Sequence, residues 1–180
     1  MNTMPENKAV GILSELLSLE CGYNPAEARL IRMAAILHDC GKQRIPKHIK
    51  DKAGKLTVQE IDVMKTHTKI GFDMLSCLRG EIREVAQNVA LWHHEFWNGQ
   101  GYWGVKSSAL PRYVGIVSLC DVLVALIYRR VYKPAWPPTE ALEYIKSMAG
   151  IQFCPELTDI FIWLIRGNSR IIAVFEEVSA

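Results

Sequence analysis

Histidine and aspartate side chains that could bind metal ions stand at four separate places in the chain. Imidazole and carboxylate together suit divalent transition metals, and no CxxC pair offers a competing thiolate site. Neighbouring residues on a helix point about 100° apart, so one helix end that carries two ligands can serve two ions. The candidate ligands are His38, Asp39, His67, His93, His94 and Asp121. These residues predict a pair of metal ions bridged by a carboxylate.

Each candidate ligand also has an ordinary structural explanation. A single HD or HH dipeptide is common by chance, and a lone histidine such as His67 is more often a surface or capping residue. Asp121 differs because it lies in the apolar run from Tyr113 to Tyr128, where an unpaired carboxylate costs several kcal/mol. That run contains no Lys or Arg, so the acid needs another cation. The combined set favours a metal site, whereas His48 is interpreted as a surface residue.

Basic residues gather next to two of these places. Residues 42–55 carry six cations against Asp51 alone: Lys42, Arg44, Lys47, Lys50, Lys52 and Lys55. A second group follows the apolar run: Arg129, Arg130 and Lys133. A solvated loop is the usual fate of such a charge run. Its position beside the candidate ligands instead predicts an anionic substrate, with phosphate the leading candidate.

Residues 95–111 interrupt the helical periodicity with glycines and aromatic side chains. Trp97, Tyr102 and Trp103 could stack on nucleobases, and the glycines would let the backbone approach a ligand closely. The alternative interpretation places these aromatic rings in the core. Their position directly after His93 and His94 leaves both interpretations open.

The remaining periodicity predicts a single all-α domain over residues 1–180 with about seven helices. Asn24 followed by Pro25 is an N-cap signal, and Thr57 with Glu60 is a capping box. Helices are expected at 10–17, 25–38, from 57 to beyond 67, at 82–93, at 111–128, from 137 and from 155. Residues 42–56 are expected to form a loop. The tail at 171–175 is compatible with a short strand or a helix.

Composition narrows the class of protein. The chain has 180 residues, 49% of them hydrophobic and 22% charged, with a net charge of +2. This balance argues against disorder and against a generally polycationic binder of duplex nucleic acid. Five scattered cysteines and the absence of a signal-peptide pattern predict reduced thiols in the cytoplasm. The longest apolar run is shorter than the ~20 residues that span a bilayer, so no membrane association is expected.

The order of the motifs resembles the HD-GYP family of HD-superfamily metal-dependent phosphohydrolases. The similarity covers residues 6–165 and rests on several blocks in the same order: His38-Asp39-Cys40-Gly41-Lys42 with Ile45-Pro46, Gly54-Lys55-Leu56-Thr57, His67-Thr68-Lys69-Ile70-Gly71, His93-His94-Glu95, Asn98-Gly99-Gln100-Gly101-Tyr102, and Asp121 with Arg130, Tyr132 and Lys133.

The resemblance implies a helical bundle that hydrolyses cyclic dinucleotides, chiefly cyclic di-GMP, through a hydroxide held by two metal ions. Iron or manganese would be the metal, with zinc, nickel or magnesium as alternatives. The six candidate ligands would bind the ions, with Asp39 as the bridge and Lys42 at the scissile phosphate or the hydroxide. Residues that would hold the substrate are Lys42, Arg130, Lys133, Gly101 and Tyr102. A separate protein with a GGDEF synthase-type or regulatory domain is a possible partner.

Four positions depart from the family pattern. Glu6 stands where a first histidine ligand is expected, and a carboxylate there could still bind metal. Trp103 replaces the proline of GYP, Val124 replaces an aspartate that holds guanine, and Val131 replaces another proline. These departures leave two further functions open: a catalytically degenerate binding or regulatory module, and an HD-type hydrolase of ordinary nucleotides.

Overall fold

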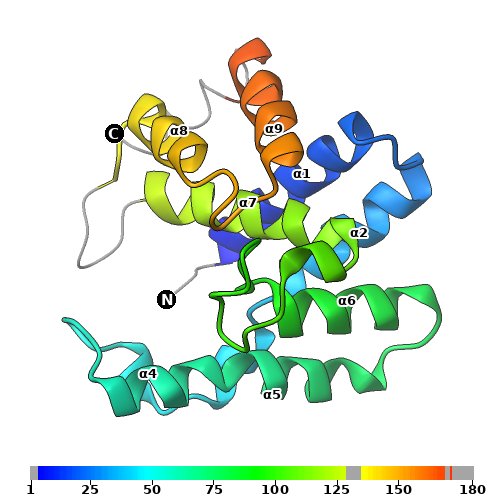
Figure 1. The fold of residues 1–180 in the computed structure, drawn as a ribbon. Coiled ribbons are helices and arrows are strands. Elements are labelled where there is room, and N and C mark those ends of the chain that lie inside the picture. Colours follow the sequence, from blue (N-terminus) through cyan, green and yellow to red (C-terminus); the bar gives the residue numbers. More distant parts are fainter. Residues whose placement is uncertain (1–3, 129–134, 169–170, 172–180) are drawn as a thin grey trace.

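Helices form nearly all the regular structure of the computed structural model, which describes residues 4–128, 135–168 and 171 (Figure 1). Within those residues no strand occurs, and the only β-type pairing is an isolated bridge between Ala149 and Phe153. The elements are α1 (Met4–Glu20), α2 (Pro25–Leu37), η1 (Cys40–Arg44), α3 (Lys47–Lys50), α4 (Val58–Lys65), α5 (His67–Met74), η2 (Leu75–Cys77), α6 (Glu81–Trp92), η3 (Ser107–Ala109), α7 (Arg112–Ile127), α8 (Pro138–Ser147) and α9 (Pro155–Gly167). The all-α prediction is confirmed.

The helix starts follow the capping residues in the sequence. The Asn24 side chain accepts hydrogen bonds from the backbone N–H groups of Ala26 and Glu27, and Glu27 completes a capping box. Thr57 and Glu60 form the second capping box, at the start of α4. Each box satisfies N–H groups that the first helical turn leaves without partners.

Two parts of the chain differ from the expected elements. The helix expected to continue from Thr57 past His67 is divided at Thr66 into α4 and α5. There the Thr66 hydroxyl donates to the Val63 carbonyl, and the His67 ring bonds the Met64 carbonyl. These side-chain bonds coincide with the division, where the Thr66 backbone N–H donates to the Val63 carbonyl only three residues earlier. The segment expected as a loop contains the short helices η1 and α3.

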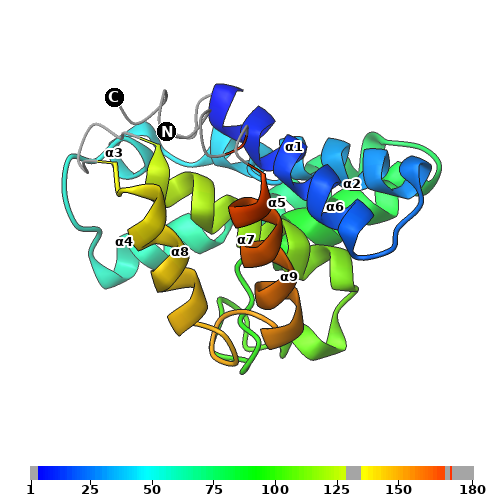
Figure 2. The same cartoon turned by 90° about the horizontal axis from the view of Figure 1, so that it is seen from above.

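Helix α7 lies at the centre of the bundle, with α8 and α9 packed on one side and α1 against it on another (Figures 1 and 2). Helix α2 packs between α1 and α6, and α5 packs on α6 and η1. Most of α7 is buried, as expected for its apolar sequence, and Asp121 is 9% exposed within it. No helix in the described ranges is long and apolar enough to cross a membrane. Predicted features at Arg130, Val131, Lys133 and 172–175 lie outside the described residues.

Gly41 lets η1 lie directly on α5. A Cβ atom at this position would overlap the carbonyl of His67 and lie 2.6 Å from the backbone nitrogen of Gly71. Overpacking of this kind typically destabilises by about 1–3 kcal/mol, so Gly41→Ala should lower the melting temperature by roughly 3–10 °C. Thermal unfolding followed by circular dichroism measures this change. Gly54→Ala is the control, because a Cβ there meets nothing within 4 Å; equal melting temperatures would contradict the prediction.

Candidate metal centre

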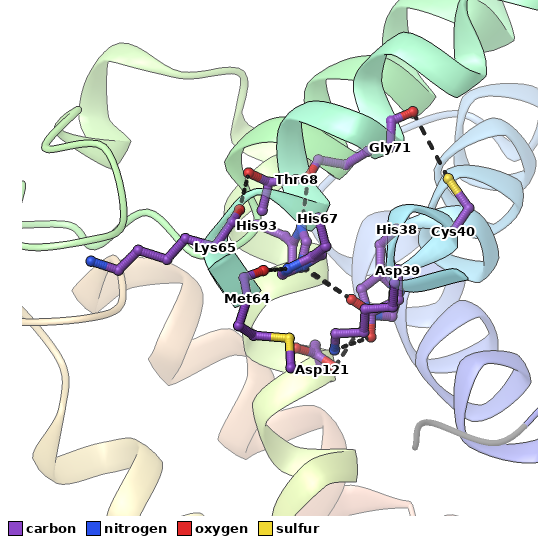
Figure 3. Close-up of polar contacts among 12 residues, drawn as sticks. His38, Asp39, Cys40, Met64, Lys65, His67, Thr68, Gly71, His93 and Asp121 are labelled. Carbon is purple, nitrogen blue, oxygen red and sulfur yellow. Dashed lines mark hydrogen bonds and ion pairs between the residues drawn. The ribbon is translucent and has the colours of Figure 1, made fainter. Parts of the chain in front are cut away.

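Four segments of the fold carry the predicted ligands to one place (Figure 3). One pair follows α2, one histidine opens α5, a second pair follows α6, and an aspartate lies in the middle of α7. Their potential ligand atoms form two groups, each with all atoms within 4.8 Å of one another. The first group is Asp39, His67, His93 and His94; the second is His38, His93 and Asp121. The structure thus brings all six predicted residues together, from helices far apart in the chain.

Three of the histidines are oriented by their own helices. In each, Nδ1–H donates to a backbone carbonyl three or four residues earlier, which leaves Nε2 unprotonated in the neutral ring. The bonds are His38 to Ala35 (2.6 Å), His67 to Met64 (2.6 Å) and His93 to Val89 (2.9 Å). Histidines that bind metals in proteins almost always donate their other ring N–H in this way. The tautomer and the ring direction are therefore those of metal ligands.

The three Nε2 atoms point at carboxylates without forming hydrogen bonds. The His38 Nε2 lies 3.2 Å from an Asp39 oxygen and 3.4 Å from an Asp121 oxygen. The His67 Nε2 lies 3.3 Å from the other Asp39 oxygen. None of the Nε2 atoms of His38, His67 and His93 has a hydrogen-bond partner in the described structure. Buried polar atoms are rarely left this way, and a divalent cation among them would bind nitrogen and oxygen together. These residues fit the metal ions that the sequence implies.

Asp39 is a member of the first group, and one of its oxygens also faces a histidine of the second group. Its Oδ1 atom lies 3.3 Å from the Nε2 of His67 and 3.7 Å from that of His93, and its Oδ2 atom faces His38. His93 is the member that the two groups share, but its single Nε2 lone pair can serve only one ion. A carboxylate has two oxygens and can serve two. The geometry therefore supports Asp39 over His93 as the bridge.

The charges of the site favour ionised carboxylates. Burial alone would raise the pKa of the Asp39 carboxyl, but the Lys42 ammonium, 2.6 Å away, and His38 hold it well below its usual range. Burial also opposes ionisation of Asp121, and His38 likewise lowers the pKa of that carboxyl. In the metal-free protein, protonated His38 is therefore the cation beside Asp121, and a bound metal ion would take the place of its proton. Burial lowers the pKa of His38, but Asp39 and Asp121 raise it to about 10.

Metal binding should consequently compete with a proton on His38. A metal needs the unprotonated Nε2, and a pKa of about 10 keeps the ring protonated through neutral pH in the metal-free protein. Raising the pH removes this competitor, so the apparent affinity for Mn²⁺ should increase about tenfold per pH unit between pH 7 and 8.5. Calorimetric titrations in buffers with different ionisation enthalpies measure the proton released. An affinity that stays constant over this range would contradict the assignment.

His94 is held differently from the other three histidines. Its ring lies 4.0 Å from the ring of His93 and 4.4 Å from that of Tyr102, measured between centroids. Burial lowers the pKa of His94 to about 3, so the ring is neutral at physiological pH. Gly101 makes the approach of Tyr102 possible, because a Cβ there would lie 2.5 Å from the Cα of Glu95. Burial, with the charges of Asp39 and Asp121, raises the pKa of Tyr102 to about 12.

The other sequence-derived candidates lie elsewhere. Glu6 is buried in α1 and belongs to neither ligand group. Burial, and after it the charge of Glu6, raises the pKa of Tyr128, the residue that follows α7. Val124 is buried in the hydrophobic core. Arg130 and Lys133 lie outside the described residues.

Sequence reasoning missed the residues that hold the loop after His94. Glu95 is 3% exposed, and its carboxylate accepts hydrogen bonds from the backbone N–H groups of Trp103 (2.7 Å) and Val105 (2.8 Å). The Trp103 indole donates to the Thr68 hydroxyl. An acid directly before a glycine-rich loop was the one available signal, because such carboxylates often bind the loop backbone.

Comparison with known proteins agrees with this site. Residues 3–157 match the protein-family model described as HD domain. The chain belongs to the HD domain family. It is 40% identical over 165 residues to the cyclic di-GMP phosphodiesterase response regulator RpfG of Xanthomonas campestris, covering 91% of this chain and 43% of that protein. It is 39% identical over 165 residues to a cyclic di-GMP phosphodiesterase of Thermotoga maritima, covering 91% and 45%. The resemblance to HD-GYP proteins is confirmed.

Other relatives extend the comparison. A 3′3′-cGAMP-specific phosphodiesterase of Vibrio cholerae is 33% identical over 154 residues, which are 85% of this HD domain chain and 30% of that protein. The chain thus spans less than half the length of these curated relatives. Among solved structures, an HDG"Y"P protein from Bdellovibrio bacteriovorus aligns with a TM-score of 0.72 at 19% identity, covering 92% of this chain and 53% of that one. That likeness shows the fold.

Proposed function

We propose that this chain is a metal-dependent phosphodiesterase that hydrolyses a cyclic dinucleotide, with cyclic di-GMP as the leading substrate. The observation that carries the proposal is the convergence of two histidine and carboxylate groups on Asp39. The relatives named as cyclic di-GMP phosphodiesterases supply the substrate class. Both parts are needed, since an HD-type site alone is compatible with other phosphate esters.

Each residue of the two ligand groups, together with Lys42, has a role in the proposed reaction. Two bound divalent ions would supply a water whose pKa is lowered from 15.7 to about 7 and would polarise the phosphodiester. His38, His67, His93, His94 and Asp121 would hold these ions, and Asp39 would present one oxygen to each. Lys42, whose side chain is 26% exposed beside Asp39, can donate a hydrogen bond to a phosphate oxygen from the solvent side.

The metal and substrate assignments follow from ligand chemistry. HD domain proteins bind divalent metals, and nitrogen and oxygen ligands without thiolate suit iron or manganese, with zinc, nickel or magnesium as alternatives. The proposal assigns no ion to Glu6, because it lies in neither group. Gly101 and Tyr102, next to His94, and Arg130 and Lys133 are proposed substrate contacts. The described cysteines carry free thiols, which supports a cytoplasmic location.

Regulation is proposed to come from another protein. One relative is named a response regulator. From the resemblance to HD-GYP proteins, we propose that a partner with a regulatory or GGDEF synthase-type domain controls this site.

A substrate panel tests the proposed activity. The chain is loaded anaerobically with Fe²⁺ or Mn²⁺, its metal content is measured, and cyclic di-GMP, 3′3′-cGAMP and ordinary nucleotides are supplied. Linearisation of a cyclic dinucleotide is expected. Release of a nucleoside or inorganic phosphate from nucleotides alone would favour a general HD-type hydrolase. Binding of cyclic di-GMP without turnover at full metal occupancy would favour a degenerate binding module.

A further inference from the structure

Among the described residues, no hydrogen bond orients the His94 ring in the way that one orients each of the other candidate histidine ligands. His38, His67 and His93 each donate Nδ1–H to a carbonyl of their own helix. Within the described residues, the contacts of the His94 ring are instead with other rings, those of His93, Tyr102 and His67. Because ring packing replaces the hydrogen bond, the direction of His94 depends on where Tyr102 lies.

Tyr102 is placed by the loop that follows His94. Its backbone N–H donates to the His94 carbonyl at 3.3 Å, so the loop folds back on the residue that carries the imidazole. Gly101 lies so close to the backbone of residues 94–96 that no side chain fits there. The ring of Tyr102 then lies on the ring of His94 with an interplanar angle of 34°.

Hydrogen bonds and a cation–π contact of Trp103 hold this loop in place, and the family pattern has proline at this position. The Trp103 backbone N–H donates to Glu95 at 2.7 Å, a bond that proline could not make. Its indole Nε1–H donates to the Thr68 hydroxyl at 3.0 Å, and the Lys69 ammonium lies 3.6 Å from the centroid of its ring. Thr68 and Lys69 directly follow His67 on α5, so Trp103 ties the loop to the helix that carries another candidate ligand.

We propose that Trp103 and Glu95 are positioning residues that hold the Tyr102 ring against His94 and thereby orient this fourth imidazole toward the metal ion. The proposal rests on the metal binding of the proposed function but not on its hydrolytic activity. Partners that orient a metal ligand typically change metal affinity by about 10–100-fold when they are removed. Loss of the Tyr102 ring or of the Trp103 bonds should therefore weaken one ion of the pair and leave the other in place.

Cobalt provides a probe that reads ligand geometry directly. The full chain is titrated with Co²⁺, and affinity is measured by calorimetry while visible absorption reports the coordination of each ion. Tyr102→Ala and Trp103→Pro are expected to lower the affinity for one Co²⁺ by about 10–100-fold and to shift its absorption bands. Tyr102→Phe, which keeps the ring, should restore the parent affinity and spectrum. Trp163→Ala is the matched control, because Trp163 is 65% exposed on α9.

Parent affinity and spectrum in both Tyr102→Ala and Trp103→Pro would overturn the proposal. If Trp103→Pro does not fold, as judged by circular dichroism of the metal-free protein, the comparison of Tyr102→Ala with Tyr102→Phe decides alone. A Tyr102→Phe variant as weak as Tyr102→Ala would also overturn it, since the phenol hydroxyl rather than the ring would then matter. A chain that binds two Co²⁺ with these variant effects but hydrolyses no cyclic dinucleotide would refute only the proposed function.

Discussion

Asp39→Asn should lower the proposed hydrolysis of cyclic di-GMP by at least about a thousandfold, equivalent to about 4 kcal/mol of transition-state stabilisation. The side chain lies within 3.2–3.7 Å of the Nε2 atoms of His38, His67 and His93, so one carboxylate is close to histidines of both ligand groups. An amide has the same shape but carries no charge and offers one oxygen instead of two. It can complete one group only.

Metal analysis separates this loss from unfolding. The parent is expected to hold two ions per chain and Asp39→Asn at most one, measured by mass spectrometry after anaerobic loading. Asp159→Asn is the matched control, because this exposed aspartate on α9 is remote from the site in sequence and structure. Full activity in Asp39→Asn, or two tightly held ions, would show that the bridge is another residue.

The ligand types could be predicted from the sequence, but the pairing of charges could not. Asp121 in an apolar run indicated a buried acid that needs a cation, and α7 is indeed the most buried helix of the bundle. The sequence near Asp121 has no cation because the partner, His38, follows the end of α2 and lies beside Asp121 only in the folded chain. Such long-range pairs leave no local pattern in the chain.

The orienting interactions were predictable to different degrees. Carbonyl acceptors such as those of Ala35 and Met64 belong to the backbone, so no residue type signals them. The break between α4 and α5 coincides with side-chain bonds at Thr66 and His67, which a continuous helical pattern in the sequence does not reveal. By contrast, the capping boxes at Asn24 and Thr57 are local, and their residues placed both helix starts correctly.

The contacts of the aromatic residues in the loop of residues 95–106 could not be predicted from the sequence pattern. Its aromatic residues were compatible with a surface that stacks on nucleobases or with a place in the core, and the structure shows that Tyr102 and Trp103 contact candidate ligands or the residues next to them. Tyr102 packs on His94, and Trp103 is fixed by Glu95 and Thr68. A proline at position 103 would make neither Trp103 bond, so this chain fastens the loop by contacts that the family pattern does not encode.

Lys42→Ala should reduce turnover by about 10²–10³-fold while leaving the metal content unchanged. The Lys42 ammonium lies 2.6 Å from the Oδ2 atom of Asp39, at the more exposed side of the ligand groups. A bound phosphodiester adds negative charge on that side, and a fixed cation stabilises the further charge that develops in the transition state. Because the lysine binds no metal, its removal should act mainly on kcat.

A purely structural role for Lys42 predicts the opposite pattern. If its only task were to neutralise Asp39, removing the ammonium would leave that carboxylate freer to bind a cation, so metal affinity would rise and turnover would persist. Measuring Mn²⁺ affinity and kcat together therefore distinguishes the two roles. Lys47→Ala is the matched control, since this lysine is exposed in α3 within the same basic segment. If Lys42 acts by touching the phosphate, removing a different lysine of the same segment should have little effect. A loss of turnover as large in Lys47→Ala would therefore indicate that the net positive charge of the segment attracts the substrate.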